Sequence, residues 1–345
     1  MDTNTNKTKS RTTLQHIAED TGLSISTISR VLSRSKRTHT KNEVKILASA
    51  KKLNYLFIQS MPDSIGDRPM KIALVTEIFE GEFYSSLFYG FYQASLNSNV
   101  EFSFVEVNHL SSKPAELISS ISRIYDAICI FLPEFKREDY LELKNMMDDT
   151  PIVSLAPIVN PLIDTVTFDA YRGGHLAASH FEEMGFTKVG VIAGPRNKVE
   201  ALYRKNGFID HITAANNMEC VWVFEGDYSL ESGYRAYADL KKHNISNIAI
   251  FGSNDQTCFG FIKHALLDGR NIPEDIAITG YDDLPFCKIF IPELTSVSTS
   301  FYELAKATIS LLQKKLYDQN DSNGNHGHIN LVPVSLSVRA STLKN

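Results

Sequence analysis

The chain has 345 residues, of which 43% are hydrophobic and 22% are charged, and its formal net charge is −5. This composition is ordinary for a globular protein, and the length accommodates two or three domains. The longest apolar runs are far shorter than the ~20 residues of a membrane-spanning helix, and the polar N-terminal stretch is unlike a secretory signal. The four cysteines are widely separated, without the spacing of a metal site. We therefore expect a cytoplasmic protein with no cofactor, no bound metal and no membrane partner.

Charge is unevenly distributed along the chain. Residues 1–60 contain eleven Lys or Arg and four Asp or Glu, so a basic segment precedes an acidic remainder. A basic segment on an acidic body indicates a module that binds a polyanion such as nucleic acid. A solvated charged surface is the alternative interpretation.

Residues 13–57 show the periodicity of a small helical domain. Apolar residues recur at helical spacing in segments 14–18, 28–32 and 44–53, which predicts three short helices that share one core. Gly22 is expected to end the first helix in a left-handed conformation, and Ser24 is expected to cap the second. Residues 1–11 are polar, and we expect them to form a disordered arm.

The first two of these helices form a candidate helix-turn-helix, whose second helix would enter the major groove of DNA. Arg can pair with guanine there, Ser can donate or accept, and Ile can contact a thymine methyl group. The polar and basic residues nearby suit phosphates. The candidate DNA-binding residues are Ile25, Ser26, Thr27, Ser29, Arg30, Arg34, Lys36 and Arg37. A plain helical hairpin with a charged face is the alternative.

From residue 70 onward, β-rich runs alternate with amphipathic helical patterns such as 84–96, 173–184 and 202–214. This alternation is typical of parallel sheets that are covered by helices on both faces. The strands are too numerous for one comfortable sheet, so we expect two doubly wound lobes. Open sheets of this kind bind ligands at the carboxyl ends of their strands, which predicts a site in the cleft between the lobes.

Several long motifs resemble the lactose/galactose-repressor (LacI/GalR) family of bacterial transcription regulators. The family's DNA-binding head is similar to TLQHIAEDTGLSISTISRVLS. Its core is similar to DAYRGGHLAASHFEEMGFTKVGVIAGP (169–195), FGSNDQTCFGFIKHALLDGRNIPEDIAITGYDDLPF (251–286) and IPELTSVSTSF (291–301). The number and order of these motifs make the resemblance more specific than any one of them, and it extends over almost the whole chain.

The resemblance implies an all-α helix-turn-helix headpiece joined to an α/β two-lobed periplasmic-binding-protein-like core with two doubly wound parallel sheets. We assign residues 1–57 to the headpiece and residues 58–69 to a hinge. The chain of such cores crosses between the lobes three times, and we expect the crossings near 168, 297 and 328. The first lobe would then comprise 70–168 with 297–328, and the second 169–296 with 329–345.

The resemblance also implies a small ligand in the cleft. Asp282 matches the family's cleft aspartate, Arg204 its arginine, and Asn254 a residue that both donates and accepts. The matching aromatic positions are Phe83, Tyr84, Tyr228 and Phe301. Each has a structural alternative: a loop cap for Asp282, a helix cap for Asn254, a link between lobes or the balancing of an acidic neighbour for Arg204, and core packing for the rings. Together they suit a polyhydroxylated ligand, and a purine is the alternative.

The hinge departs from the family's pattern. Family hinges commonly form a short helix with an Ala-Arg element, and a leucine from each subunit enters the minor groove, whereas this segment reads IQSMPDSIGDRP. Pro62 would disrupt a helix interior by ~3 kcal/mol, and Met61 and Ile65 are the apolar candidates for insertion. We expect a passive tether, or a shorter helix that begins at Pro62.

The resemblance therefore predicts a ligand-responsive repressor of carbohydrate-utilisation genes. It would bind an approximately palindromic double-stranded operator as a homodimer and respond to a sugar. A purine or another metabolite is the alternative effector. An enzyme and a sugar-binding protein without a regulatory role are the contrary classes. We assign no catalytic residues, because the sequence lacks GxxxxGK[ST], HExxH, GxSxG and a GxGxxG after a strand.

Overall fold

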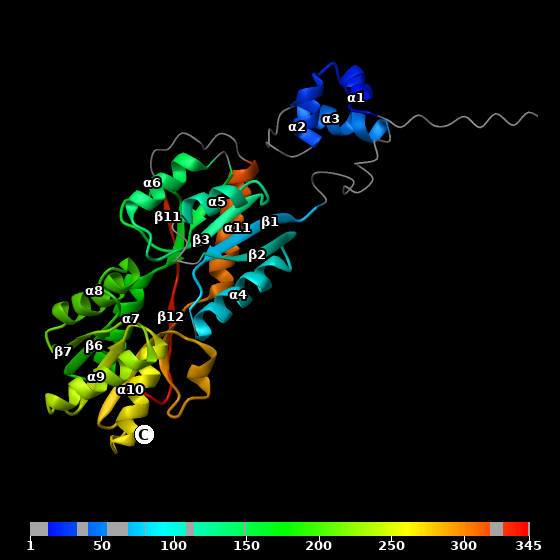
Figure 1. Cartoon of the computed structure of the whole chain (residues 1–345). Helices are drawn as coiled ribbons and strands as arrows, with labels where there is room; N and C mark the ends of the chain where they lie inside the picture. The colour runs from blue at the N-terminus through cyan, green and yellow to red at the C-terminus, as the bar shows by residue number, and fades with distance from the viewer. Residues whose placement is uncertain are drawn as a thin grey trace, which may run out of the picture. The chain divides into compact units, whose positions relative to one another are not determined.

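The computed structural model describes residues 13–32, 41–53, 68–79, 81–107, 114–147, 150–317 and 327–343. The chain divides into two compact units, residues 1–70 and residues 71–345 (Figure 1). Most of the predicted hinge, residues 58–67, and the predicted arm, residues 1–11, lie outside the described residues. Among the described helices, none is long and apolar enough to cross a membrane.

The first unit contains three short helices, α1 (Leu14–Thr21), α2 (Ile25–Leu32) and α3 (Lys41–Lys52). These helices are held together by a small core of buried apolar side chains, which comprises Ile17, Ile28, Leu32, Ile46 and Ala50. A core of this size is supplemented by polar contacts. The carboxylate of Asp20 on α1 accepts hydrogen bonds from Ser49 Oγ at 2.6 Å and from Lys52 Nζ at 2.8 Å on α3.

The turn between α1 and α2 has the two features that the sequence predicts. Gly22 ends α1 with a φ of 69°, and its N–H donates to the Ala18 carbonyl at 2.8 Å. Ser24 precedes α2, and its hydroxyl accepts a hydrogen bond from the Thr27 N–H at 3.2 Å. Both expectations are confirmed, because glycine adopts a left-handed conformation without steric cost and a serine hydroxyl satisfies a free N–H of a first helical turn.

The second unit begins with a six-stranded sheet in the order β11-β5-β4-β3-β1-β2. Its strands are β1 (Met70–Thr76), β2 (Val100–Glu106), β3 (Ala127–Phe131), β4 (Ile152–Ser154), β5 (Thr165–Phe168) and β11 (Ile329–Val332). The helices α5 (Pro114–Ile121) and α6 (Arg137–Met146) share one core with this sheet. The helices α4 (Glu82–Ser95) and α11 (Phe301–Tyr317) pack together (Figure 1). We refer to this sheet and its helices as the first lobe.

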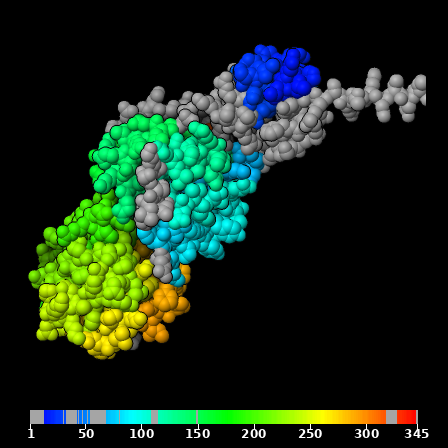
Figure 2. Space-filling model, in the orientation of Figure 1, coloured from blue at the N-terminus to red at the C-terminus, as the bar shows by residue number. Residues whose placement is uncertain are grey.

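A second six-stranded sheet has the order β12-β10-β9-β8-β6-β7. Its strands are β6 (Lys188–Ala193), β7 (Glu219–Glu225), β8 (Ile248–Gly252), β9 (Ile276–Asp282), β10 (Thr295–Ser298) and β12 (Ser335–Ser337). One face packs against α7 (Ala170–Glu183) and α8 (Val199–Ala214), and the other against α9 (Leu230–Lys242) and α10 (Asp255–Leu267). This second lobe also includes the short 3-10 helix η1 (Pro285–Lys288), whose Phe286 packs edge-on against Phe259 of α10 at 5.1 Å. In Figure 2 the orange segment after β9 lies beside the yellow α10 on the surface.

One crossing between the lobes differs from the sequence expectation. β5 ends at Phe168 and α7 begins at Ala170, and β10 pairs with β9 as far as Ser298, so the first two crossings lie near the expected residues 168 and 297. β11 pairs in parallel with β5 of the first lobe as far as Val332, whereas β12 pairs with β10 of the second lobe. The third crossing therefore lies at residues 333–334 and not near 328. Residues 329–332 belong to the first lobe because parallel pairing with β5 satisfies their backbone groups there.

The helices α7 and α8 approach each other closely at two glycines. A Cβ added to Gly174 would overlap the Arg204 carbonyl oxygen, and a Cβ added to Gly207 would overlap the Tyr171 carbonyl oxygen. In both cases the obstacle is backbone, which has no room to move aside. The two helices therefore form one rigid pair, and α8 carries Arg204 with it.

Candidate DNA-binding surface and effector cleft

The helix α2 exposes both polar and apolar side chains near its N-terminus. Ile25 is 48% exposed, Ser26 and Ser29 are exposed, and Ile28 is buried. The Thr27 hydroxyl lies 2.8 Å from the Ser24 hydroxyl and so belongs to the cap of the helix. Of the remaining predicted DNA-binding residues, Arg30 lies in α2, and Arg34, Lys36 and Arg37 lie outside the described residues.

Residues at the carboxyl edges of the two sheets of the second unit contact each other, and we refer to the region between these edges as the cleft. On one side, the Phe286 N–H of the second lobe donates to Glu82 Oε2 of the first lobe at 3.1 Å. On the other side, Glu134 of the first lobe pairs with Lys198 Nζ at 3.2 Å and accepts from Asn197 Nδ2 at 2.9 Å. The loops that follow β1 and β3 therefore meet the loops that follow β6 and β9, which is the arrangement that the sequence predicts for a ligand site.

The first-lobe wall of this cleft is a cluster of aromatic rings. Phe83 of α4 lies 5.3 Å from Phe301 and 5.5 Å from Phe131, and Phe168 lies 5.7 Å from Phe301. Tyr84 lies 6.3 Å from Phe131. Phe131 and Phe168 are the last residues of β3 and β5, so the strand ends place them at the cleft. Three predicted residues, Phe83, Tyr84 and Phe301, thus form a single group with two rings that the sequence analysis did not single out.

The second-lobe wall is organised around a buried guanidinium group. Arg204 Nη1 donates to the Ser253 carbonyl at 2.5 Å, and Nη2 lies 3.5 Å from Asp282 Oδ1. The guanidinium carbon lies 3.7 Å from the Tyr281 ring centre and 5.6 Å from the Tyr228 ring centre. Arg204 and Asp282 are only 8% and 5% exposed. Buried charges of this kind persist only when they are paired, so the two side chains stabilise each other.

Burial shifts the pKa values of the carboxyl groups at this wall. Burial raises the pKa of Asp282 well above the usual carboxyl range, the Arg204 guanidinium opposes this shift, and Glu200 adds to it. Glu200 lies one helical turn before Arg204 on α8, and its own pKa is raised by burial and lowered by Arg204. Glu200 was absent from the sequence prediction. The spacing of four residues on one helix, which places both side chains on the same face, is the signal that could have identified it.

Several buried polar atoms around Arg204 have no hydrogen-bond partner among the described residues. These atoms are Arg204 Nε, Tyr228 OH, Ser253 Oγ, Thr279 Oγ1 and Tyr281 OH. Buried polar groups are almost always hydrogen-bonded, to protein, water or ligand. Their concentration at one wall of the cleft marks a place where a polar ligand would satisfy them.

Asn254 has the helix-capping role that the sequence analysis gave as its structural alternative. Its side-chain oxygen accepts from the Thr257 N–H at 3.1 Å and caps α10, and its amide nitrogen donates to the Tyr228 carbonyl at 2.9 Å. The amide thereby holds the backbone of Tyr228, which has a φ of 70°. A direct contact between Asn254 and ligand stays a prediction.

The described residues contain no group of three or more His, Cys, Asp or Glu side chains that could hold a metal ion. The polar and aromatic side chains at the cleft suit a bound organic molecule.

Comparison with known proteins identifies the chain. Residues 13–56 match the model of the bacterial regulatory proteins of the lacI family, and residues 178–342 match a periplasmic-binding-protein-like domain. The chain thus combines a LacI-family helix-turn-helix domain with a periplasmic-binding-protein-like domain. The HTH-type transcriptional repressor PurR of Haemophilus influenzae (strain KW20) is 25% identical over 340 residues, which cover 95% of this chain and 98% of PurR. These similarities support a ligand-responsive, DNA-binding regulator of transcription.

Solved structures share its fold. The Lac repressor dimer bound to operator and an anti-inducer has a TM-score of 0.68 at 24% identity, over 97% of this chain and all of that chain. A LacI-family regulator from Enterococcus faecalis with bound ribose has a TM-score of 0.67 at 26% identity, over 79% of this chain and all of that chain.

Proposed function

We propose that this LacI-family regulator represses carbohydrate-utilisation genes and that a sugar in the interlobe cleft modulates its binding to operator DNA. One observation carries this proposal: an aromatic wall on one lobe faces an Arg204–Asp282 pair surrounded by unsatisfied polar atoms on the other. Aromatic rings pack against the apolar face of a sugar. Carboxylate and guanidinium groups bond to its hydroxyls. The ribose-bound regulator of similar fold is consistent with this class of effector.

A thermal-shift screen of the full chain tests the sugar proposal. Mono- and disaccharides, including D-ribose, D-galactose, D-glucose, lactose and cellobiose, would be compared with hypoxanthine and guanine. A ligand at 100 times its Kd adds about 2.7 kcal/mol of stability to the native state. We expect a shift with a sugar that is lost in Asp282→Ala. A shift with a purine alone would contradict the sugar proposal and would favour the alternative effector.

We propose that α2 contacts the DNA. This helix belongs to the headpiece, residues 1–57, and the protein would act in the cytoplasm, where the DNA lies. Ile25, Ser26, Thr27 and Arg30 would lie against base edges, and Ser29, Arg34, Lys36 and Arg37 would lie near the phosphates. The exposure of Ile25 and Ser26 supports this assignment, because a buried side chain could not reach DNA. Footprinting on an approximately palindromic operator tests it: half-sites about one helical turn apart are expected.

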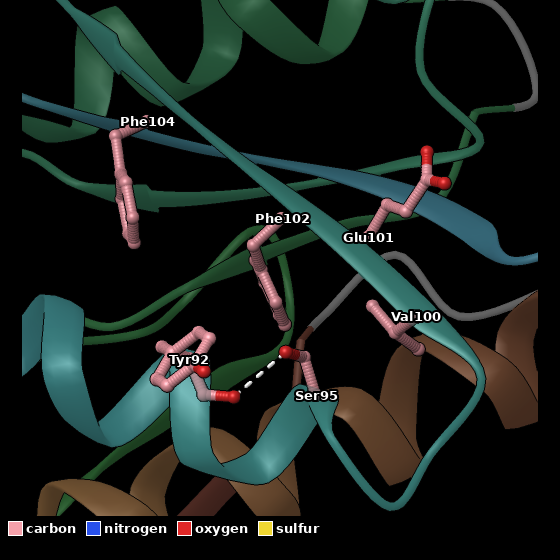
Figure 3. A pocket seen from close by; sticks show the side chains of 6 residues that line it. All are labelled: Tyr92, Ser95, Val100, Glu101, Phe102 and Phe104. Carbon is pink, nitrogen blue, oxygen red and sulfur yellow. Dashed lines mark hydrogen bonds between the residues drawn. The ribbon is translucent and has the colours of Figure 1, made fainter.

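A homodimer is proposed by analogy with the Lac repressor dimer, and α4 with the edge strand β2 offers a surface for it. Tyr89, Tyr92, Leu96 and Phe104 are 59%, 54%, 64% and 41% exposed. Figure 3 shows a pocket of about 270 Å³ on this surface, lined by Tyr92, Ser95, Val100, Glu101, Phe102 and Phe104. Exposed apolar patches of this kind typically mark protein interfaces.

Sedimentation equilibrium tests this surface. We expect Leu96→Arg to yield monomers, whereas Leu141→Arg, at a 51% exposed leucine of α6, should leave the dimer intact. A monomeric wild-type chain, or a dimer unaffected by Leu96→Arg, would contradict the assignment.

A further inference from the structure

We propose that the effector cleft accepts an unphosphorylated ligand and rejects phosphate esters and other anions. This inference rests on the proposed sugar-sensing function, since it concerns the same cleft, and it names the chemical form of the effector. Three observations support it. Carboxyl groups outnumber cationic side chains at the cleft, these cations are already paired, and the helices that begin around the cleft have acidic residues at their N-termini.

Carboxylates outnumber cations at this site. Glu77 and Glu134 of the first lobe and Glu200 of the second all raise the pKa of the Tyr84 hydroxyl after burial itself, which shows that their charges act on the aromatic wall. Asp282 adds a fourth carboxyl group on the facing wall. A phosphate dianion would meet the carboxyl groups of Glu77 and Glu134 and would raise the pKa values of the buried Glu200 and Asp282 further, in a place where little water screens the charges, so its binding would be costly.

The cations that contact these groups are already paired. Lys198 Nζ lies 3.2 Å from Glu134 Oε1. The Arg204 guanidinium is divided between the Ser253 carbonyl and the Asp282 carboxylate. Among the described residues no partner is found for Arg204 Nε, and a single N–H suits a hydroxyl oxygen better than a dianion.

The helix N-termini at the cleft do not supply an anion site either. In parallel α/β sheets the helices that follow the strands begin at the carboxyl edge, and their free N–H groups are the usual place for a phosphate. Here α4, α6, α8, α9, α10 and α11 carry acidic residues in their first turns, at Glu82, Glu138, Asp139, Glu200, Glu231, Asp255 and Glu303. The first turn of α7 has none, and the carboxylate of its N-cap residue Asp169 accepts a hydrogen bond from the Arg172 N–H. Such acidic residues stabilise the helix dipole and repel a second anion.

The same groups suit neutral hydroxyls. A carboxylate accepts hydrogen bonds from a hydroxyl, and the unpartnered atoms Tyr228 OH, Ser253 Oγ and Arg204 Nε can donate to one. The cell would therefore sense the sugar before it is phosphorylated. The reactions that consume the effector would be phosphorylation or hydrolysis of the free sugar, and not reactions of a sugar phosphate.

Calorimetry with matched probes tests the inference on the full chain. D-ribose, D-glucose and D-galactose would be titrated beside D-ribose 5-phosphate, D-glucose 6-phosphate, D-galactose 6-phosphate and inorganic phosphate. We expect any sugar that binds to do so at least about 100-fold more tightly than its phosphate ester, because like charges are juxtaposed in the ester complex. Inorganic phosphate should give no saturable heat.

Glu200→Lys is the decisive variant, with Glu142→Lys on the exposed surface of α6 as the matched control. We expect Glu200→Lys to bind inorganic phosphate or a sugar phosphate at least about tenfold more tightly than wild type, and Glu142→Lys to be unchanged. Circular dichroism establishes folding, and Glu200→Gln replaces Glu200→Lys if the latter unfolds, with a smaller gain in the same direction.

The outcomes separate this inference from the function on which it rests. A phosphate ester that binds as tightly as its parent sugar would overturn the inference, as would phosphate binding by wild type that Asp282→Ala removes. A gain of phosphate binding by Glu200→Lys with no response to any free sugar would support exclusion of anions and would count against the sugar proposal.

Discussion

The backbone carbonyl of Asp282 accepts a hydrogen bond from the Thr299 hydroxyl at 3.0 Å. Asp282 ends β9 beside Arg204, and Thr299 lies at the second crossing, between β10 and α11. A proposed ligand-binding residue is thus joined directly to a connection that leads into the first lobe. A ligand that changes the position of Asp282 would act on this connection, and coupling between sites requires such a difference in contacts between two states.

Thr299→Val is expected to separate ligand binding from its effect on DNA. The variant keeps the size of the side chain and loses the hydrogen bond to Asp282. We predict that ligand affinity changes by less than about threefold, whereas the ligand-induced change in operator affinity, typically 5–150-fold in coupled systems, falls towards one. Operator titrations with and without ligand provide the measurement. Thr308→Val is the control, because Thr308 is equally buried and donates to the Leu304 carbonyl within α11. An unchanged coupling in Thr299→Val would count against this connection.

The pair formed by Asp283 and Arg339 is expected to stabilise the turn after β9. Asp283 Oδ1 lies 2.6 Å from Arg339 Nη2, Oδ2 accepts from Ser337 Oγ at 2.8 Å, and both charged side chains are nearly buried. Breaking a buried pair from one side costs about 3–5 kcal/mol. We predict a loss of this order for Asp283→Ala in urea unfolding. Removal of the exposed Glu303–Lys306 pair should cost less than about 1 kcal/mol, so equal losses would refute the assignment.

Two buried carboxyl groups give the second lobe a specific pH dependence. Burial raises the pKa of Asp255 and of Asp282, and the charge of Asp282 raises that of Asp255 further. A carboxyl group with a raised pKa in the folded state retains its proton longer than in the unfolded chain. Its contribution to stability is therefore complete below the ordinary carboxyl value of about 4 and is lost as the pH rises above it.

The comparison of wild type with Asp282→Asn isolates this effect. Buried His180, whose pKa burial lowers, makes stability fall at low pH and so opposes the carboxyl effect in the raw profile. We predict that the free energy of unfolding of Asp282→Asn, relative to wild type, rises between about pH 4 and pH 7 in ligand-free protein, because burial raises the pKa of Asp282 to about 7. Urea titrations at each pH measure it. A pH-independent difference would show that Asp282 titrates normally.

Arg30 is expected to contribute to the choice of DNA sequence more than to general affinity. Loss of a bidentate contact to guanine costs about 1–3 kcal/mol of specific binding. Arg30→Ala should lose this amount on operator DNA and little on random DNA. Arg30→Lys should behave similarly, since it keeps the charge and loses the forked geometry. Equal losses on both kinds of DNA would assign Arg30 to phosphate contact instead.

Local signals in the sequence were sufficient for much of the architecture. Gly22 and Ser24 act within one turn of chain, and the alternation of strands and helices follows from burial on both faces of a sheet. The third crossing was harder to predict, because residues 329–332 and 335–337 are both β-like and only long-range pairing decides which sheet each one joins. The helices α5, α6 and α11 were not singled out.

At the cleft, too, contacts between distant segments could not be predicted from local sequence. The resemblance indicated Arg204 and Asp282 because they lie in recognisable motifs. Phe131 and Phe168 looked like ordinary strand ends, and their proximity to Phe301 depends on the folding of three distant segments. Glu200 carries no motif of its own, and its importance arises from burial, which the sequence does not display.

The close contact of α7 and α8 at Gly174 and Gly207 has a consequence for engineering. A designer who wishes to alter effector choice by exchanging segments between relatives cannot transplant α8 alone, because a new partner with a larger residue at either crossing point would displace Arg204. The exchangeable module is the whole of residues 170–214. Libraries that vary the cleft should hold both glycines constant and diversify only the side chains that face the ligand.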